Sequence, residues 1–145
     1  MSLVINIADA VTAELNVAPA GTFDPAITAV RRVLPEFELA DLAELKVSVV
    51  PKSVMITGST RGVSQYEISV DIGVQRKLGK DLDSEVVVLG TLMDQIADYL
   101  RRRQLSAAPY AAWIGIAHEP VYAPEHLAEQ RVFTSVLTVT YRAMR

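Results

Sequence analysis

The feature that most constrains the fold is an alternation of apolar and polar residues in the middle of the chain. From Tyr66 to Val74, apolar side chains occupy every second position, and polar residues or glycine stand between them. A period of two over about ten residues is typical of a strand that buries one face and exposes the other to water. Residues 53–60, just before it, are also predicted to be extended. The two segments are therefore expected to form a hairpin whose turn lies within residues 59–64.

The hairpin contains the sequence TGSTRG at residues 57–62, which matches the glycine-rich phosphate turn of short-chain dehydrogenases in its composition. That turn needs a helix directly after it, because the helix N-terminus binds the pyrophosphate. Here Ser64 stands where the last glycine is required, and a strand pattern follows. The Tyr-x-x-x-Lys pair of that class is also absent from the sequence. We therefore expect no dinucleotide site, and Gly58 and Gly62 are interpreted as residues of a turn that needs positive φ.

The first helix is predicted at residues 3–16, where apolar residues recur on one face. Asn6 is expected as its N-cap, with Asp9 three residues on as the acidic partner of a capping arrangement. Pro19 and Gly21 follow and break any continuation of the helix. The sheet is thus expected to be preceded by one amphipathic helix.

A longer helix is predicted to start at Asp83 and Ser84 and to run to about Leu105. Its apolar residues recur at the spacing of one helix face, and acidic residues lie off that stripe. The three arginines at residues 101–103 are expected in its last turns, where cations complement the helix dipole. The apolar stripe consists of Leu89, Leu92, Met93, Ile96 and Leu100.

The remaining strands are less regular. Residues 26–34 have helical spacing, but their β-branched residues and the following Pro35 favour a strand. Residues 37–45 are interpreted as a polar turn, and residues 45–50 as a strand that Pro51 stops. Two more strands are predicted after the long helix, at residues 113–122 and 132–143.

We expect a single α+β domain over residues 1–145, in the order α-β-β-β-α-β-β. The strands occur in runs rather than in alternation with helices, which favours a mostly antiparallel sheet. One long helix is expected to pack against that sheet, with the N-terminal helix at its flank. A chain of 145 residues is long enough to bury such a core without disulfides or metals.

Composition argues against several classes of function. The chain has no cysteine, which rules out disulfides, thiolate metal sites and a cysteine nucleophile. A net charge of −3 and a pI near 5.4 give no support to specific nucleic-acid binding. There is no basic secretory signal and no stretch of about 20 apolar residues, so we expect a soluble protein without membrane contact. The hydrophobic content of 50% favours burial against another subunit.

His118 and His126, with Glu119 and Glu125, form the only grouping in the sequence that resembles a set of metal ligands. No HExxH motif or second pair of ligands accompanies them, so they are interpreted as part of a polar loop between two strands. The same two histidines are the only candidates for the base of a serine or threonine nucleophile, and no Gly-x-Ser-x-Gly motif is present. We therefore expect no metal, no cofactor and no catalytic residue.

The candidate functional residues lie instead in loops that could contact a partner. The hairpin tip is small and polar with one long cation, as suits a projecting loop. A second loop of this kind precedes the long helix, and three arginines stand at the end of that helix. The predicted interaction residues are Arg61 and Gly62 at the tip, Lys77 and Lys80 before the helix, and Arg101, Arg102 and Arg103 after it.

Three stretches carry a resemblance to a known family: LKVSVVPKSV at residues 45–54, RGVSQYEISVDIGVQRK at residues 61–77 and LMDQIADYL at residues 92–100. With their flanking elements they cover most of the chain. The chain resembles small bacteriophage and prophage tail proteins of the tail-terminator or tail-completion group, also known as neck or head–tail joining proteins. In that group the middle strands alternate in the same way before an acidic linker and a helix.

The resemblance implies a subunit that forms a ring, commonly six-fold, at the head-proximal end of a tail tube. Such a ring stops polymerisation of the tube and offers a surface to the head connector. The implied partners are other copies of the chain, the tail-tube protein and the head-connector protein, and no enzymatic activity is implied. The implied location is the virion tail, reached from the cytoplasm of the bacterial host during assembly.

Two alternatives stay open at the level of the sequence. A small-ligand-binding or enzymatic α+β domain would need converging polar groups between the long helix and the sheet, where the helix offers only Met93 and Tyr99. A component of a phage-tail-like secretion apparatus could have a similar sequence in a different gene neighbourhood.

Overall fold

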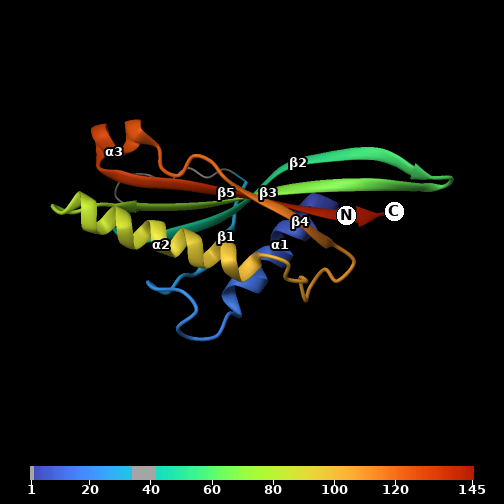
Figure 1. Ribbon diagram of the computed structural model, residues 1–145, viewed down its shortest axis with the longest axis horizontal. Helices are drawn as coiled ribbons and strands as arrows, with labels where there is room; N and C mark the ends of the chain where they lie inside the picture. Colours follow the sequence, from blue (N-terminus) through green and yellow to red (C-terminus); the bar gives the residue numbers. More distant parts are fainter. Residues whose placement is uncertain (1, 34–41) are drawn as a thin grey trace.

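A computed structural model of the chain describes residues 2–33 and 42–145. In this part of the chain five strands form one sheet in the order β1-β2-β3-β5-β4, and three helices accompany it (Figure 1). The predicted α+β class is therefore confirmed. In chain order the elements are α1 (Leu3–Asn16), β1 (Ala29–Arg31), β2 (Lys46–Thr60), β3 (Val63–Lys77), α2 (Leu82–Leu100), β4 (Ala112–His118), α3 (Pro124–Gln130) and β5 (Val132–Met144).

The sheet is antiparallel apart from one edge. β1 runs parallel to β2, from the pair Ala29–Val47 to the pair Arg31–Val49, and every other neighbouring pair of strands is antiparallel. The predicted mostly antiparallel sheet is confirmed. Two strands of 15 residues each, β2 and β3, form the predicted hairpin, and β5 pairs with β3 along most of its length.

Pro51 does not end a strand, contrary to the sequence-based prediction. β2 continues through it, and the register with β3 shifts between Pro51 and Ser53. A β-bulge of this kind adds an extra residue, bends the strand and accommodates a proline that lacks an N–H. The strand is buried on the N-terminal side of Pro51 and exposed on the C-terminal side. The bulge therefore marks the place where the hairpin leaves the body of the molecule.

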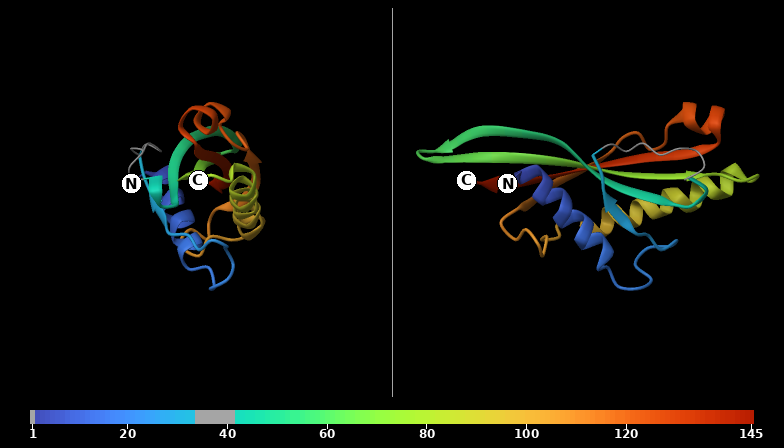
Figure 2. Two further views of the ribbon diagram at one scale, coloured as in Figure 1. Left: turned by 90° about the vertical axis from the view of Figure 1, so that its left-hand side faces the viewer. Right: turned by 180° about the vertical axis from the view of Figure 1, so that it is seen from behind.

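One hydrophobic core joins α1 and α2 to a face of the sheet, and both helices lie along the same side of the strands (Figures 1 and 2). Four of the five alternating apolar residues of β3 are fully buried, Ile68, Val70, Ile72 and Val74, and Tyr66 is partly buried. The buried residues of α2 are those of the predicted stripe, Leu89, Leu92, Met93, Ile96 and Leu100. α1 adds Ile7, Ala8, Ala10, Val11 and Leu15 to the same cluster.

Helix α1 covers the predicted residues, but its N-cap is Ser2 and not Asn6. The Ser2 hydroxyl accepts a hydrogen bond from the Ile5 N–H at 3.4 Å, so the helix already begins at Leu3. A serine ahead of the first apolar residue is itself a good N-cap, which leaves Asn6 inside the helix.

The strand predicted at residues 26–34 is confirmed only for its centre, β1. The Asn16 side chain donates to the Ala29 carbonyl at 2.9 Å and accepts from the Ala29 N–H at 2.8 Å. These bonds fix the end of α1 to the start of β1, and they satisfy backbone groups on the side of β1 that faces away from β2. The polar turn predicted at residues 37–45 falls largely outside the described residues.

Helix α2 ends at Leu100, before the predicted Leu105. Arg101 leaves the helix with extended backbone (φ −58°, ψ 122°), and Arg102 has a left-handed φ of 59°. Arg101, Arg102 and Arg103 therefore follow the helix and do not lie in its last turns. Leu100 and Leu105 are both fully buried. In one continuous helix they would point about 140° apart, so the chain must turn for both to reach the core.

The strand predicted at residues 113–122 is shorter than expected, and a short helix, α3, lies in the segment that was expected to be a polar loop between the last two strands. β4 ends at His118, and Pro120 has no N–H with which to continue the ladder. Pro124 stands in the first turn of α3, and Arg131 ends the helix with a φ of 52°. The observed order is thus α-β-β-β-α-β-α-β. A proline followed by residues that favour helix was the available signal.

Candidate interaction surface

The distal part of the β2–β3 hairpin projects from the body of the molecule, beyond α1 and α2 (Figures 1 and 2). We call residues 53–66 the arm. Every residue of β2 from Ser53 to Thr60 is exposed, whereas residues 47–50 of the same strand are buried. The first part of β2 therefore lies in the core, and its second part is exposed to solvent.

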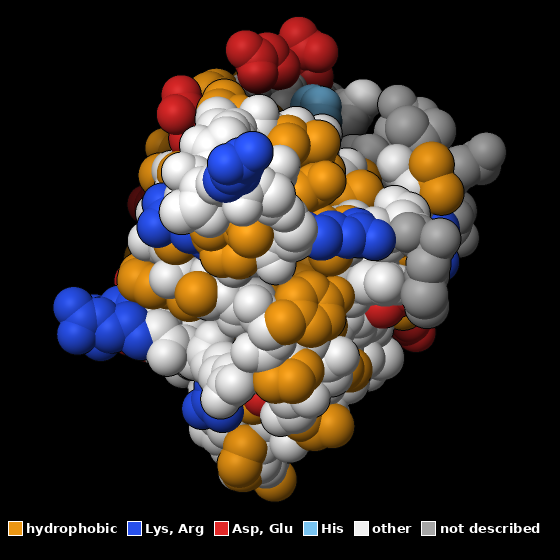
Figure 3. All heavy atoms as spheres, turned by 90° about the vertical axis from the view of Figure 1, so that its right-hand side faces the viewer, with side chains coloured by type: hydrophobic (Ala, Val, Ile, Leu, Met, Phe, Trp, Pro, Cys, Tyr) orange, Lys and Arg blue, Asp and Glu red, His pale blue; other side chains and the backbone are white. Residues whose placement is uncertain are grey.

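Apolar side chains are exposed on both faces of the arm. Val54, Met55 and Ile56 leave 40%, 63% and 58% of their surface accessible. Because neighbouring residues of a strand point to opposite faces, three apolar residues in a row place apolar groups on each face. Figure 3 looks onto this end of the molecule, where hydrophobic side chains and Lys and Arg side chains share the surface. Grouped exposed apolar residues are typical of a surface that a partner covers.

The outer edge of β2 is unpaired along the arm. β1 pairs only with residues 47–49, and no other strand in the described part of the chain pairs with this edge. Residues 53–60 contain no charged residue and no proline, which are two of the devices that protect an edge strand. The edge therefore offers a row of free backbone N–H and C=O groups to an added strand.

Arg61 and Gly62 form the turn at the tip of the arm. Gly62 has a φ of 81°, which glycine adopts without strain, so its predicted role is confirmed. Gly58 is different: it lies within β2 opposite Ser64 and has no positive φ. Arg61 is exposed and has no ion pair among the residues that the structure describes. The tip thus carries one free cation.

Strand β5 braces the arm from its inner side. Ser64 and Arg145 exchange backbone hydrogen bonds of 2.7 and 2.9 Å, and the Arg145 guanidinium lies 6.0 Å from the centroid of the Tyr66 ring. At the base of the arm, the Lys52 ammonium reaches the Asp71 carboxylate at 3.8 Å. The arm is therefore a supported piece of sheet with one open edge.

Lys77 and Lys80 lie at the opposite end of the molecule from the tip. β3 runs for 15 residues between the tip and Lys77, which corresponds to roughly 45 Å. Arg131, which the sequence analysis did not single out, supports this corner by donating from Nη2 to the Gly79 carbonyl at 2.6 Å. The two lysines therefore belong to a surface separate from the arm.

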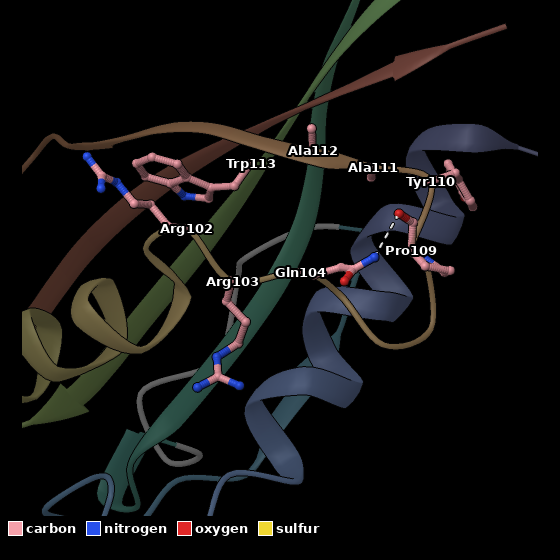
Figure 4. A pocket seen from close by; sticks show the side chains of 8 residues that line it. All are labelled: Arg102, Arg103, Gln104, Pro109, Tyr110, Ala111, Ala112 and Trp113. Atoms are coloured by element: carbon pink, nitrogen blue, oxygen red, sulfur yellow. Dashed lines mark hydrogen bonds between the residues drawn. The ribbon is translucent and has the colours of Figure 1, made fainter.

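The arginines after α2 differ in their surroundings. Arg103 donates from Nε to the Tyr99 carbonyl at 2.8 Å, and its guanidinium lies 3.9 Å from the Tyr99 ring centroid. Its Nη1 is also 3.6 Å from the carboxylate of the buried Glu14. Arg103 thus ties α2 to α1. Arg102 extends beside Trp113 at a groove of about 360 Å³, while Arg103 points to the other side (Figure 4).

The two histidines do not converge. His118 Nε2 lies 2.7 Å from the Ser135 hydroxyl, and His126 Nδ1 lies 2.9 Å from the Thr134 hydroxyl. Burial lowers the pKa of His118, and the negative charge of Asp94 opposes this shift. Ser135 is fully buried, so a substrate could not reach it. The described residues hold no group of three or more side chains suited to bind a metal ion.

The predicted interaction residues are therefore divided among three places. They are Arg61 and Gly62 at the arm tip, Lys77 and Lys80 at the opposite end of the molecule, and Arg101, Arg102 and Arg103 in the segment that follows α2. The structure adds Val54, Met55 and Ile56, which the sequence analysis placed in an ordinary hairpin strand. Their signal was a run of three apolar residues where one-sided burial would demand alternation.

Comparison with protein-family models and with curated proteins finds no match to this chain. No helix in the described ranges is long and apolar enough to cross a membrane. The function is therefore inferred from the surfaces described above.

Proposed function

We propose that this protein is a structural subunit that assembles with copies of itself into a ring and uses the arm as its principal contact. The observation that supports this most strongly is the exposure of Val54, Met55 and Ile56 on an edge strand without charge or proline. A monomer that kept this edge in water would be open to uncontrolled pairing. Assembly covers the edge and uses the same backbone groups for a specific contact.

The resemblance of the strand and helix patterns to phage tail proteins gives this ring its proposed place. The ring caps or completes the tail tube, stops its growth and joins it to the head connector. The partners are then the tail-tube and head-connector proteins, and the subunit acts without catalysis. Its place is the virion tail, after assembly in the host cytoplasm.

The test is to add the purified protein to its cognate tail-tube protein during polymerisation and to measure tube lengths by negative-stain microscopy. We expect tubes to become shorter as the ratio of this protein to tube protein rises. Ile56→Lys, which places a charge on the arm edge, should lose this effect. Val87→Lys is the matched control because Val87 is 67% exposed on α2, away from the arm. Tubes of unlimited length at molar excess of the wild-type protein would contradict the proposal.

A small-ligand-binding domain is the second candidate, and the groove between Arg102 and Trp113 is the observation that favours it (Figure 4). The interior site considered from the sequence is less suited. Met93 is fully buried, and the Tyr99 hydroxyl already donates to the Glu14 carbonyl at 3.1 Å. Screening for ligands that shift the fluorescence of Trp113, the single tryptophan, would test this candidate.

A component of a phage-tail-like secretion apparatus would use the same arm and the same kind of assembly. The genes that flank this one distinguish the two settings, because head and connector genes accompany a virus and not a secretion system.

A further inference from the structure

The backbone direction at the open edge of the arm can be derived from the hydrogen-bond ladder. The Arg32 N–H donates to the Val49 carbonyl at 2.9 Å, on the side of β2 that faces β1. Val49 therefore directs its backbone groups outward, and this direction alternates along a strand. The bulge after Pro51 shifts the count by one residue. Beyond the bulge, the outward positions are Val54, Ile56 and Gly58.

The opposite edge of the same sheet is β4, and it is open in the same way. No strand in the described part of the chain pairs with its outer side. Its 7 residues, AWIGIAH, include no Asp, Glu, Lys, Arg or Pro. The Glu119 N–H donates inward to the Val136 carbonyl at 3.1 Å. By alternation, His118 and Ile116 direct their backbone groups outward.

We propose that the arm of one copy adds as a strand to the β4 edge of the next copy, so that the sheet continues from subunit to subunit. The inference rests on the proposed self-assembly and names the two surfaces that meet. The edges lie on opposite sides of one sheet, so the contact is head-to-tail, the kind that closes into rings. Their lengths agree, because residues 53–60 face the 7 residues of β4.

The direction of the added strand follows from the topology. Three antiparallel pairings connect β2 to β4 within one copy, so these two strands run in opposite directions. When all copies face the same way, the arm is antiparallel to the neighbouring β4. A register that pairs Ile56 with Ile116 brings the outward-facing backbone groups of the two strands opposite each other. The same register places Lys52 near Glu119.

Charge complementarity favours a second copy of this chain as the occupant. Residues 52–66 contain the basic residues Lys52 and Arg61 and no acidic residue. Residues 112–130 contain three glutamates and no Lys or Arg, and all three are exposed: Glu119, Glu125 and Glu129. In the register given above, Lys52 lies near the opposite charge of Glu119, whereas two arms paired antiparallel at Ile56 would bring Lys52 of one copy close to Arg61 of the other. A two-fold contact between arms is therefore disfavoured.

Disulfide trapping tests the contact directly, because the chain has no cysteine of its own. Ile56→Cys and Ile116→Cys are made in separate chains and also in one chain, oxidised, and resolved on a non-reducing gel. A disulfide needs Cα atoms about 4.4–6.8 Å apart, so it reports strand pairing. We expect covalent dimers only when the two single variants are mixed, and a ladder of multimers from the double variant. Val87→Cys mixed with Ile56→Cys is the control for random collision.

Three results would overturn this contact. A dimer from Ile56→Cys alone would mean that arms pair with arms. No product from the mixture at the highest attainable concentration would refute the arm–β4 contact, as would equal product from the Val87→Cys control. Thermal unfolding checks that each variant folds. Val54→Cys with His118→Cys is a second pair in the same register, two residues along each strand from Ile56 and Ile116.

The outcome separates this inference from the proposed function. If microscopy shows rings but no disulfide forms, the proposed self-assembly is supported and the arm–β4 contact is refuted. Disulfide ladders from a protein that does not limit tube length would support the contact and contradict the role in tail completion.

Discussion

Glu14, Tyr99 and Tyr141 bring polar groups into the core where α1, α2 and β5 meet. Glu14 is only 5% exposed, and its carboxylate accepts a hydrogen bond from the Ser106 N–H at 2.9 Å. The Tyr141 hydroxyl is buried without a hydrogen-bond partner among the described residues. Burial raises the pKa of Tyr141, and the charge of Glu14 adds to the shift, so the phenol stays neutral. The two tyrosines therefore differ in whether the hydroxyl is satisfied.

Tyr141→Phe should stabilise the protein by about 1 kcal/mol, because it removes a buried hydroxyl that has lost its water and gained no partner. Tyr99→Phe is the matched control, since its hydroxyl donates to the Glu14 carbonyl, and its loss should cost about 1 kcal/mol. Urea unfolding of both variants measures the two changes. A loss of stability in Tyr141→Phe as large as that in Tyr99→Phe would show that the Tyr141 hydroxyl has a partner.

Because of His118, the free energy of unfolding should decrease as the pH falls below 6.5, the ordinary pKa of this side chain. The folded state lowers the pKa of His118 by burial, so the unfolded chain binds the proton first as the pH drops. The stability is thus present above pH 6.5 and is lost as the pH falls towards the lowered folded value. His118→Gln should flatten the change in Tm between about pH 7.5 and about pH 5.5. A slope in His118→Gln equal to that of the wild type would refute the assignment to His118.

At the level of elements, the sequence predicts best where burial on one face imposes a regular period. The alternation from Tyr66 to Val74 and the stripe of α2 were both confirmed, because a misplaced side chain there would expose apolar surface or bury polar groups. The predicted end of α2 was wrong because Leu105 packs into the core, and this tertiary contact overrides a helical pattern that continues in the sequence. α3 was missed because a short helix with no buried residue leaves no periodic signal.

The candidate surface was predictable only in part, for a related reason. Arg61 and Gly62 were found from turn chemistry, which is local. The exposure of Met55 depends on how far β2 continues past Pro51, and that is set by pairing with β3 along its whole length. β4 as the opposite edge depends on the order of five strands, which no local pattern encodes.

The assigned backbone directions predict how amide hydrogens of the arm exchange with solvent. In dilute protein, the amides of Val54, Ile56 and Gly58 should exchange quickly because they face the open edge. The amides of Met55 and Thr57 should be protected because they face β3. NMR-detected hydrogen exchange measures this, and assembly should extend protection to all five amides. Equal protection of all five amides in the dilute protein would contradict the open edge. Rapid exchange of the outward-facing amides after assembly would also contradict it.

At the level of the whole molecule, the buried core and the proposed contact surface lie in different parts of the structure. The body holds the core between two helices and one face of the sheet, and the arm extends away from it (Figure 1). The arm edge at residues 53–60 and β4 contain no Asp, Glu, Lys or Arg, and they lie on opposite sides of the sheet. In the proposed assembly, such a subunit has a neighbour on each side, which is the geometry of a ring.

Light scattering coupled to size exclusion, over a wide range of protein concentration, tests this account most directly, with negative-stain microscopy of the eluted peak. Arg61→Glu should fold like the wild type, because Arg61 is exposed at the tip, but it should shift assembly to higher concentration because the tip belongs to the proposed contact. The account predicts a closed ring of defined mass for the wild-type protein. A wild-type protein that stays monomeric at every concentration, even when tail-tube protein is present, would contradict it.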